Sequence, residues 1–130
     1  MRPTILIADA DELLAAAYRA FLVAEGFDVH CVGNGLDCLE ELRHNPPQAL
    51  IVDAELPWGS GLGVIEVMSH DPSISAVPVV IMTARPTALP WPRPGTHAPA
   101  TLIKPVSPST VARVLRELLE VFCTVQLGCH

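Results

Sequence analysis

Residues 49–61 read ALIVDAELPWGSG, and this stretch decides the fold. Four apolar residues, Ala49 to Val52, end on Asp53, and a loop that contains Pro57, Gly59 and Gly61 follows. A short apolar run bounded by turn residues predicts a strand that is buried on both faces. Such strands occur in parallel sheets that helices cover on both sides, so the stretch predicts an α/β fold.

The same alternation of an apolar strand and a helix recurs on both sides of this stretch. Helical spacing of apolar residues predicts helices over about residues 12–25, 36–43, 62–69 and 109–122. Ser107 and Pro108 are the expected N-cap and first residue of the last helix. Strands are expected at residues 4–8, 27–32, 49–52, 77–82 and 101–103. This order predicts a doubly wound five-stranded parallel sheet.

A proline-rich segment, residues 84–99, interrupts the alternation. Its prolines are Pro86, Pro90, Pro92, Pro94 and Pro99. Each lacks an amide donor and restricts the preceding residue, so they cannot share one regular helix. We expect the fourth helix to be replaced or shortened by an extended crossover. Trp91 within it is either an aromatic that contacts a partner or one that packs where the helix is missing.

Composition limits the classes of function. The chain has 130 residues and a net charge of −6, and half of its residues are hydrophobic, which fits one globular domain. We assign residues 1–124 to that domain and 125–130 to a C-terminal tail. An acidic chain without a Lys/Arg stripe lacks the footprint of a nucleic-acid binder. No apolar run approaches the ~18 residues that span a bilayer, so we expect a cytoplasmic protein without membrane contact.

The cysteines do not form a metal site in the sequence. None of Cys31, Cys38, Cys123 and Cys129 forms a C-x-x-C pair or has zinc-ligand spacing with histidine. We expect reduced thiols, and a cytosolic setting argues against a Cys123–Cys129 disulfide.

Polar residues close four of the predicted strands: Asp9, Asp53, Thr83 and Lys104. The carboxyl ends of parallel strands meet at one edge of a sheet, so we expect these side chains to share a pocket. Asp9 and Asp53 can hold Mg²⁺, which takes one or two carboxylates with waters and phosphate oxygens. Lys104, the only lysine, and the Thr83 hydroxyl can bind phosphoryl oxygens. Asp53 can also be the nucleophile of an aspartyl-phosphate reaction.

Four stretches, residues 5–9, 51–61, 79–84 and 102–105, resemble the signature stretches of response-regulator receiver domains, of the chemotaxis-regulator-like type, in two-component signalling. The resemblance covers nearly the whole chain apart from the proline-rich segment and the last few residues. It implies a flavodoxin-like fold and a phosphorelay in which a histidine kinase phosphorylates an aspartate.

Matched by position, the resemblance implies a role for each site residue. It makes Asp53 the phosphoacceptor and places Asp9 in a Mg²⁺ pocket, with the backbone carbonyl of Glu55 as a further ligand. Thr83 and Lys104 would bind the phosphoryl oxygens. Ala84 matches the small residue that leaves the phosphoryl group accessible, and the side chains of Glu55 and Arg85 match positions that tune dephosphorylation.

The same resemblance implies partners. A histidine kinase or a phosphotransfer protein would donate the phosphoryl group, and a downstream protein or a fused output domain would read it. The apolar end of the last helix, Val121-Phe122, either packs against a second copy in a homodimer or simply covers the sheet.

Two departures from the family pattern bear on activity. Receiver domains usually have two adjacent acidic residues after the first strand, but this chain has Asp9-Ala10-Asp11. We therefore expect weak Mg²⁺ binding; Asp11 either substitutes as a ligand or caps the first helix. Thr101 stands where the family has the aromatic residue of its output switch. The alternative is a degenerate receiver that acts as a phosphorylation-independent binding or dimerisation module.

The first strand end also resembles a motif of an enzyme family. Asp9-Ala10-Asp11 is also similar to the first motif of haloacid-dehalogenase-type phosphatases, which need a further acidic pair after the lysine. Only Glu117 and Glu120, inside a helix, follow Lys104. We therefore expect no enzyme, beyond the transfer of a phosphoryl group to the chain's own Asp53.

Overall fold

Five parallel strands form a single sheet in the computed structural model, which describes residues 2–85 and 100–127, with side chains up to residue 120. The strand order is β2-β1-β3-β4-β5. The strands are β1 (Thr4–Ala8), β2 (Asp28–Val32), β3 (Ala49–Asp53), β4 (Val79–Thr83) and β5 (Ala100–Ile103). The order reverses between β1 and β3, which confirms the predicted doubly wound, flavodoxin-like fold.

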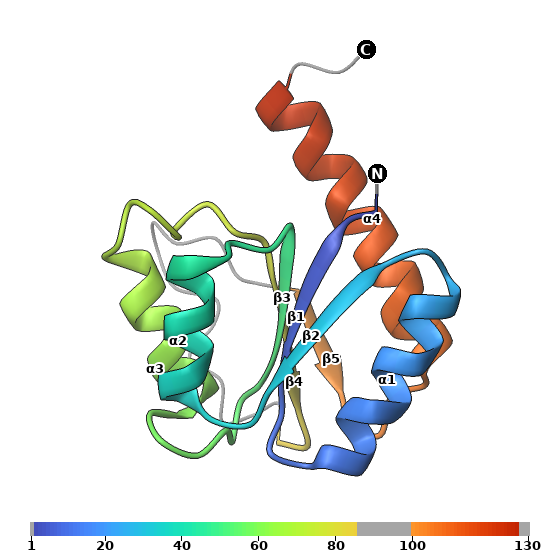
Figure 1. Ribbon diagram of the computed structural model, residues 1–130, viewed down its shortest axis with the longest axis horizontal. Helices are drawn as coiled ribbons and strands as arrows, with labels where there is room; N and C mark the ends of the chain where they lie inside the picture. Colours follow the sequence, from blue (N-terminus) through green and yellow to red (C-terminus); the bar gives the residue numbers. More distant parts are fainter. Residues whose placement is uncertain (1, 86–99, 128–130) are drawn as a thin grey trace.

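Helices cover both faces of the sheet, as Figure 1 shows. The helices α1 (Glu12–Ala24) and α4 (Pro108–Leu127) pack on one face, and α2 (Gly35–His44) and α3 (Ser60–Ser69) on the other. Among the described helices, none is long and apolar enough to cross a membrane.

The pleat of the strands divides the interior into two cores. In β1, Ile5 and Ile7 point to the face covered by α1 and α4, whereas Leu6 and Ala8 point to the face covered by α2 and α3. Successive side chains of a strand point to opposite faces, so a strand covered on both sides needs an unbroken apolar run. This is why β1, β3 and β4 show no alternation of polar and apolar residues, whereas the edge strand β2 has the exposed residues Asp28 and His30.

Short polar side chains start the helices where the sequence places them. The Asp11 side chain accepts a hydrogen bond from Leu14 N at 3.0 Å, and Ser107 Oγ accepts one from Thr110 N at 3.2 Å. Both bonds satisfy amides that have no partner within the first turn of a helix. Ser107 and Pro108 are therefore confirmed as the N-cap and first residue of α4.

The C-terminal end of α4 was predicted wrongly. The apolar spacing led us to end this helix at Phe122, but it continues to Leu127. The sequence contains no proline or glycine between Pro108 and Gly128, so nothing in it breaks the helix earlier. The helix thus crosses residue 124, and the assignment of residues 125–130 to a tail stays a prediction. The expected proline-rich crossover and Trp91 lie outside the described residues.

Gly61 allows the first turn of α3 to pack against the backbone of the strand that precedes it. Its amide donates to Ala54 O at 3.1 Å, and a Cβ built on Gly61 would collide with the carbonyl oxygen of Asp53. The collision is with backbone, which cannot rotate away. This close approach explains why a glycine stands eight residues after Asp53.

Replacing Gly61 with alanine is expected to lower the free energy of unfolding by about 1–3 kcal/mol, the usual cost of inserting a methyl group into a packed site. Gly63→Ala is the control, because its new Cβ would lie 3.5 Å from Ser60 Oγ, an ordinary contact. That variant should be neutral or gain up to about 1 kcal/mol of helix propensity. Urea unfolding measures both, and equal effects would contradict the proposed collision.

The two cysteines whose side chains the structure describes differ in exposure to solvent. Cys38 is fully buried in the core beneath α2, and burial raises the pKa of its thiol to about 12. Cys31 is exposed on β2. Because the thiolate is the reactive form, iodoacetamide at about pH 8 should modify Cys31 in the folded protein and leave Cys38 intact. Peptide mass spectrometry checks this, and urea should make Cys38 react; labelling of Cys38 without urea would contradict its burial.

Candidate functional site

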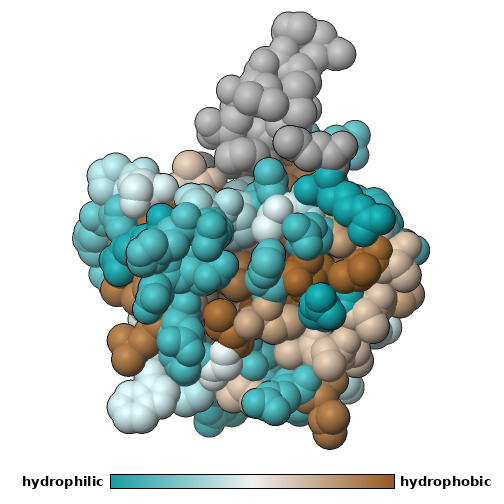
Figure 2. Space-filling view, in the orientation of Figure 1, coloured by the Kyte–Doolittle hydropathy of each residue, from teal (hydrophilic) through white to brown (hydrophobic). Residues whose placement is uncertain are grey.

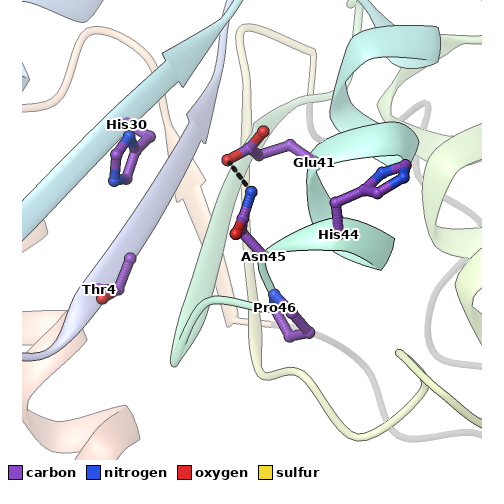
Figure 3. A pocket seen from close by; sticks show the side chains of 6 residues that line it. All are labelled: Thr4, His30, Glu41, His44, Asn45 and Pro46. Atoms are coloured by element: carbon purple, nitrogen blue, oxygen red, sulfur yellow. Dashed lines mark hydrogen bonds between the residues drawn. The ribbon is translucent and has the colours of Figure 1, made fainter.

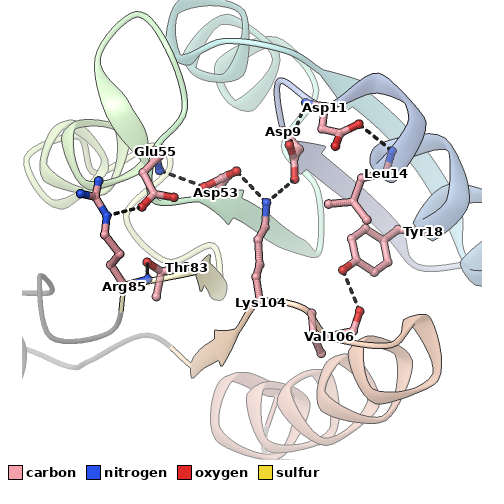
Figure 4. A network of polar contacts seen from close by, with 10 residues as sticks. All are labelled: Asp9, Asp11, Leu14, Tyr18, Asp53, Glu55, Thr83, Arg85, Lys104 and Val106. Carbon is pink, nitrogen blue, oxygen red and sulfur yellow. Dashed lines mark hydrogen bonds and ion pairs between the residues drawn. The ribbon is translucent and has the colours of Figure 1, made fainter.

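The four polar residues predicted to share a pocket all lie at the carboxyl edge of the sheet (Figure 4). Asp53 and Thr83 are the last residues of β3 and β4, and Asp9 and Lys104 directly follow β1 and β5. Lys104 Nζ donates to Asp53 Oδ2 at 2.8 Å and to Asp9 Oδ2 at 3.1 Å. The ammonium thus joins the two carboxylates, and the four residues share one pocket, as the strand order predicts.

The three charged groups of this cluster are largely removed from water. The exposed fraction of the side chain is 1% for Asp9, 13% for Asp53 and 19% for Lys104. Burial acts to lower the pKa of Lys104, but the hydrogen bonds and charges of Asp53 and Asp9 outweigh it, so the pKa lies above its ordinary value. The lysine is therefore a permanent cation at neutral pH, in a region of low dielectric where its charge acts strongly.

Backbone amides orient both carboxylates. Asp9 Oδ1 accepts from Asp11 N at 2.9 Å, and Asp53 Oδ1 accepts from Glu55 N, also at 2.9 Å. Each is an Asx-type turn, in which a carboxylate bonds the amide two residues later. Each Oδ2 therefore faces Lys104, and the positions of the acceptor oxygens depend on the loops that follow β1 and β3.

Thr83 and Arg85 line the β4 side of the pocket. Thr83 is buried and its Oγ1 accepts from Arg85 N at 2.9 Å, so the hydroxyl hydrogen can point to a ligand. The Arg85 side chain bonds Glu55 Oε1 at 3.1 Å, an ion pair exposed to solvent. The two residues expected to tune dephosphorylation therefore contact each other next to Asp53.

The acidic stretch after β1 contributes one carboxylate to the pocket. Asp11 caps α1, and its use as a substitute metal ligand stays a prediction. Ala10 is exposed and adds no oxygen. Within the described residues, no group of three or more His, Cys, Asp or Glu residues could hold a metal ion. The pocket thus presents two carboxylates, Asp9 and Asp53, to a cation.

One polar contact of the site does not follow from the apolar spacing of the sequence. Tyr18 lies on the apolar face of α1, but its hydroxyl donates to Val106 O at 2.8 Å, in the loop after Lys104 (Figure 4). The only sign of this contact in the sequence is that Tyr18 carries a hydroxyl on a helix face whose other residues are apolar.

A separate hollow of about 440 Å³ opens where β1 and β2 begin and α2 ends, away from Asp53 (Figure 3). It is lined by Thr4, His30, Glu41, His44, Asn45 and Pro46. The imidazole of His44 bonds the backbone of Glu40 at 2.8 Å instead of joining the other polar groups. Among the described residues that line the hollow, His44 therefore does not share a ligand set with the others.

Comparison with known protein families identifies the chain. Residues 5–116 match the response regulator receiver domain. The chain belongs to this family. The match includes β1 from Ile5 onwards, the whole of β2, β3, β4 and β5, and all four polar residues of the pocket.

Curated relatives include a DNA-binding response regulator and a luminescence regulatory protein. The DNA-binding response regulator MtrA of Mycolicibacterium paratuberculosis is 36% identical over 85 residues, which are 65% of this chain and 36% of MtrA. The luminescence regulatory protein LuxO of Vibrio campbellii is 37% identical over 71 residues, which are 55% of this chain and 15% of LuxO. The receiver domain thus aligns with about a third or less of the length of these relatives.

Solved structures share the fold at low sequence identity. The signal receiver domain of a putative LuxO repressor from Vibrio parahaemolyticus has a TM-score of 0.81 at 22% identity and covers 100% of this chain and 99% of its own. The receiver domain of the sensor histidine kinase PA1611 from Pseudomonas aeruginosa, with magnesium in its active-site cleft, has a TM-score of 0.79 at 20% identity. The alignment covers 92% of this chain and 99% of the PA1611 receiver domain.

Proposed function

We propose that this receiver domain accepts a phosphoryl group on Asp53 from the phosphohistidine of a histidine kinase or phosphotransfer protein, with Mg²⁺. The observation that carries the proposal is the position of Lys104 Nζ, within 3.1 Å of both Asp53 and Asp9 at the edge where β4 presents Thr83. A cation, a hydroxyl donor and a carboxylate nucleophile in one pocket suit phosphoryl transfer, which depends on positioning and charge neutralisation.

The residues divide the reaction between them. A carboxylate oxygen of Asp53 attacks phosphorus, and the bond from phosphorus to the donor's imidazole nitrogen breaks, so that the nitrogen keeps the electron pair. The amide of Glu55, 2.9 Å from Asp53 Oδ1, orients the nucleophile. Lys104 and the Thr83 hydroxyl would stabilise the charge on the transferred oxygens. The chain acts only on itself, so we do not propose an enzyme with turnover.

The oxygen atoms of the pocket fit Mg²⁺, but they provide few protein ligands. Mg²⁺ is held in proteins by one or two carboxylates together with waters and phosphate oxygens. Asp9, Asp53 and the backbone carbonyl of Glu55 would hold it, and when bound it would neutralise charge on the phosphoryl oxygens. Because Ala10 contributes no carboxylate, we expect weak binding.

Exposed apolar side chains at the same edge support a protein as the donor. Leu13, Trp58 and Leu36 are 86%, 72% and 65% exposed and lie in the first turn of α1, the loop before α3 and the first turn of α2. These segments all follow the carboxyl ends of strands. Figure 2 shows that one face of the molecule carries both hydrophilic and hydrophobic side chains. Large exposed apolar residues around a reactive group are typical of protein contact sites.

Intact mass spectrometry after incubation with Mg²⁺ and acetyl phosphate tests the proposal. The wild type should gain one phosphoryl group and Asp53→Ala none. Asp37→Ala is the control, because Asp37 is an exposed carboxylate in the first turn of α2 that bonds Asn34 and not Lys104. That variant should still be phosphorylated.

A wild type without any adduct, and without a response to beryllofluoride by NMR, would overturn the proposal. The alternative of a receiver that binds partners without phosphorylation, which the missing acidic residue at position 10 favours, would then replace it. The predicted cytoplasmic location and output partner belong to the same proposal and need cellular experiments.

A further inference from the structure

Tyr18 connects helix α1 to the loop that carries Lys104. Its ring is buried in the core between α1, α4 and the sheet, with 1% of the residue exposed. Its hydroxyl donates to the carbonyl oxygen of Val106 at 2.8 Å, across 88 residues of sequence. Val106 lies in the β5–α4 loop, two residues after Lys104.

The hydroxyl is not needed to fill the core. Phenylalanine would occupy the same volume, whereas a buried hydroxyl costs free energy unless it finds a partner. The partner that it finds is the main chain of the loop beside the site. Burial raises the pKa of Tyr18, the charge of Lys104 opposes that rise and the charge of Asp9 adds to it, so the hydroxyl lies within electrostatic reach of the cluster.

Helix α1 supports both members of an ion pair. At the N-cap of α1, Asp11 N donates to Asp9 Oδ1 and fixes that carboxylate. Further along the helix, the Tyr18 hydroxyl bonds the loop that follows Lys104. On the opposite side, Lys104 N donates to Thr83 O at 2.8 Å. A lysine side chain has many rotamers, so a defined position of Nζ between two carboxylates requires a fixed backbone on both sides of it.

We propose that Tyr18 is a positioning residue for phosphoryl transfer: its hydroxyl holds the β5–α4 loop so that Lys104 Nζ faces Asp53 and Asp9 together. This inference rests on the proposed role of Asp53 as acceptor. A small displacement of a charged group from the reacting atoms can cost up to about 100-fold in rate. The hydroxyl acts through the loop and touches neither the donor nor the acceptor.

Tyr18→Phe tests the inference because it keeps the ring and removes the hydrogen bond. At saturating Mg²⁺ and acetyl phosphate, its rate of phosphorylation should fall about 10-fold. Leu22→Val is the control: Leu22 is on α1, fully buried in the same core, and has no polar contact with the loop. It should unfold at lower urea concentration than wild type but be phosphorylated at the wild-type rate.

A second measurement observes Lys104 directly. Lys104 is the only lysine in the sequence, so protein labelled with ¹³C-lysine gives one ε-methylene signal in the NMR spectrum. In the wild type its two protons should have different shifts, because the ammonium is held in one geometry. In Tyr18→Phe they should converge towards the single shift of a mobile lysine, and in Leu22→Val they should stay apart.

The outcomes separate the inference from the proposed function. A wild-type rate and an unchanged lysine signal in Tyr18→Phe would overturn the positioning role and leave the phosphoacceptor intact. Equal loss of rate in Leu22→Val would reduce Tyr18 to a packing residue. If the wild type takes up no phosphoryl group, the function fails, and the lysine signal alone decides whether Tyr18 positions Lys104.

Discussion

Replacing Lys104 with alanine is expected to lower the rate of phosphorylation by acetyl phosphate about 100-fold or more. The ammonium is the only side-chain cation that contacts Asp53 among the described residues, 2.8 Å from Oδ2. Loss of one donor that stabilises developing charge commonly costs about 100- to 1,000-fold in rate. Intact mass spectrometry over a time course measures the loss.

The same substitution should affect stability and metal binding separately. Without Lys104, Asp9 and Asp53 are two mostly buried carboxylates without their shared cation, and the free energy of unfolding should fall by about 2 kcal/mol or more. Mg²⁺ should then stabilise Lys104→Ala more than it stabilises the wild type, because it no longer competes with an ammonium for the same oxygens. Urea unfolding with and without Mg²⁺ measures both effects.

The pH dependence of this stability difference has a defined sign. Folding raises the pKa of Lys104 above its ordinary value of 10.5. The contribution of the lysine to the free energy of unfolding is therefore complete below about pH 10.5 and is lost only as the pH rises through the higher pKa of the folded state.

Lys104→Arg is the control for Lys104→Ala, because it keeps the positive charge. If Lys104→Ala retained the wild-type rate, the assignment of Lys104 to the phosphoryl oxygens would fail.

Restoring an acidic residue at position 10 is expected to tighten Mg²⁺ binding about 10- to 100-fold. Ala10 follows Asp9 directly at the carboxyl edge and is exposed, so an aspartate there can reach the pocket without displacing core residues. Loss of even an indirect partner of a metal ligand costs about 10- to 100-fold in affinity, and a direct ligand should be worth at least as much. Mg²⁺ titration followed by NMR measures the change.

The control for this prediction is Ala10→Asn, which has nearly the same shape but no charge. It should tighten binding much less than Ala10→Asp. Phosphorylation at limiting Mg²⁺ should speed up in Ala10→Asp, whereas the rate at saturating Mg²⁺ should change little. Equal affinities in wild type and Ala10→Asp would show that position 10 does not face the metal and that weak binding has another cause.

The sequence predicted the elements and the composition of the site because both depend on local patterns. Unbroken apolar runs ending on Asp53 and Thr83 marked buried parallel strands, and the rule that their carboxyl ends meet brought Asp9 and Lys104 into the same pocket. This grouping of the four residues does not depend on sequence conservation, because the order and direction of the strands decide which strand ends lie together.

Contacts that depend on three-dimensional packing were not predictable in this way. The bond from Tyr18 to Val106 joins segments 88 residues apart, and a hydroxyl on an apolar helix face looks like any other aromatic position. The turn after β3 was expected from Pro57 and Gly59, but Trp58 and Ser60 adopt φ values of +57°, which are uncommon for residues with a Cβ. This turn also brings Gly61 against the backbone of Asp53, a close approach that turn residues alone do not reveal.

Lys104 lies directly after the end of β5 and forms ion pairs with Asp9 and Asp53. Strand β5 pairs with β4, whereas Asp53 is the last residue of β3 and Asp9 directly follows β1. The ion pairs therefore attach an edge strand to strands that are not its neighbours. A change of charge at Asp53 alters the free energy of these ion pairs, so the state of Asp53 and the attachment of the edge strand β5 are thermodynamically linked. The free energy by which one changes the other is the same in both directions.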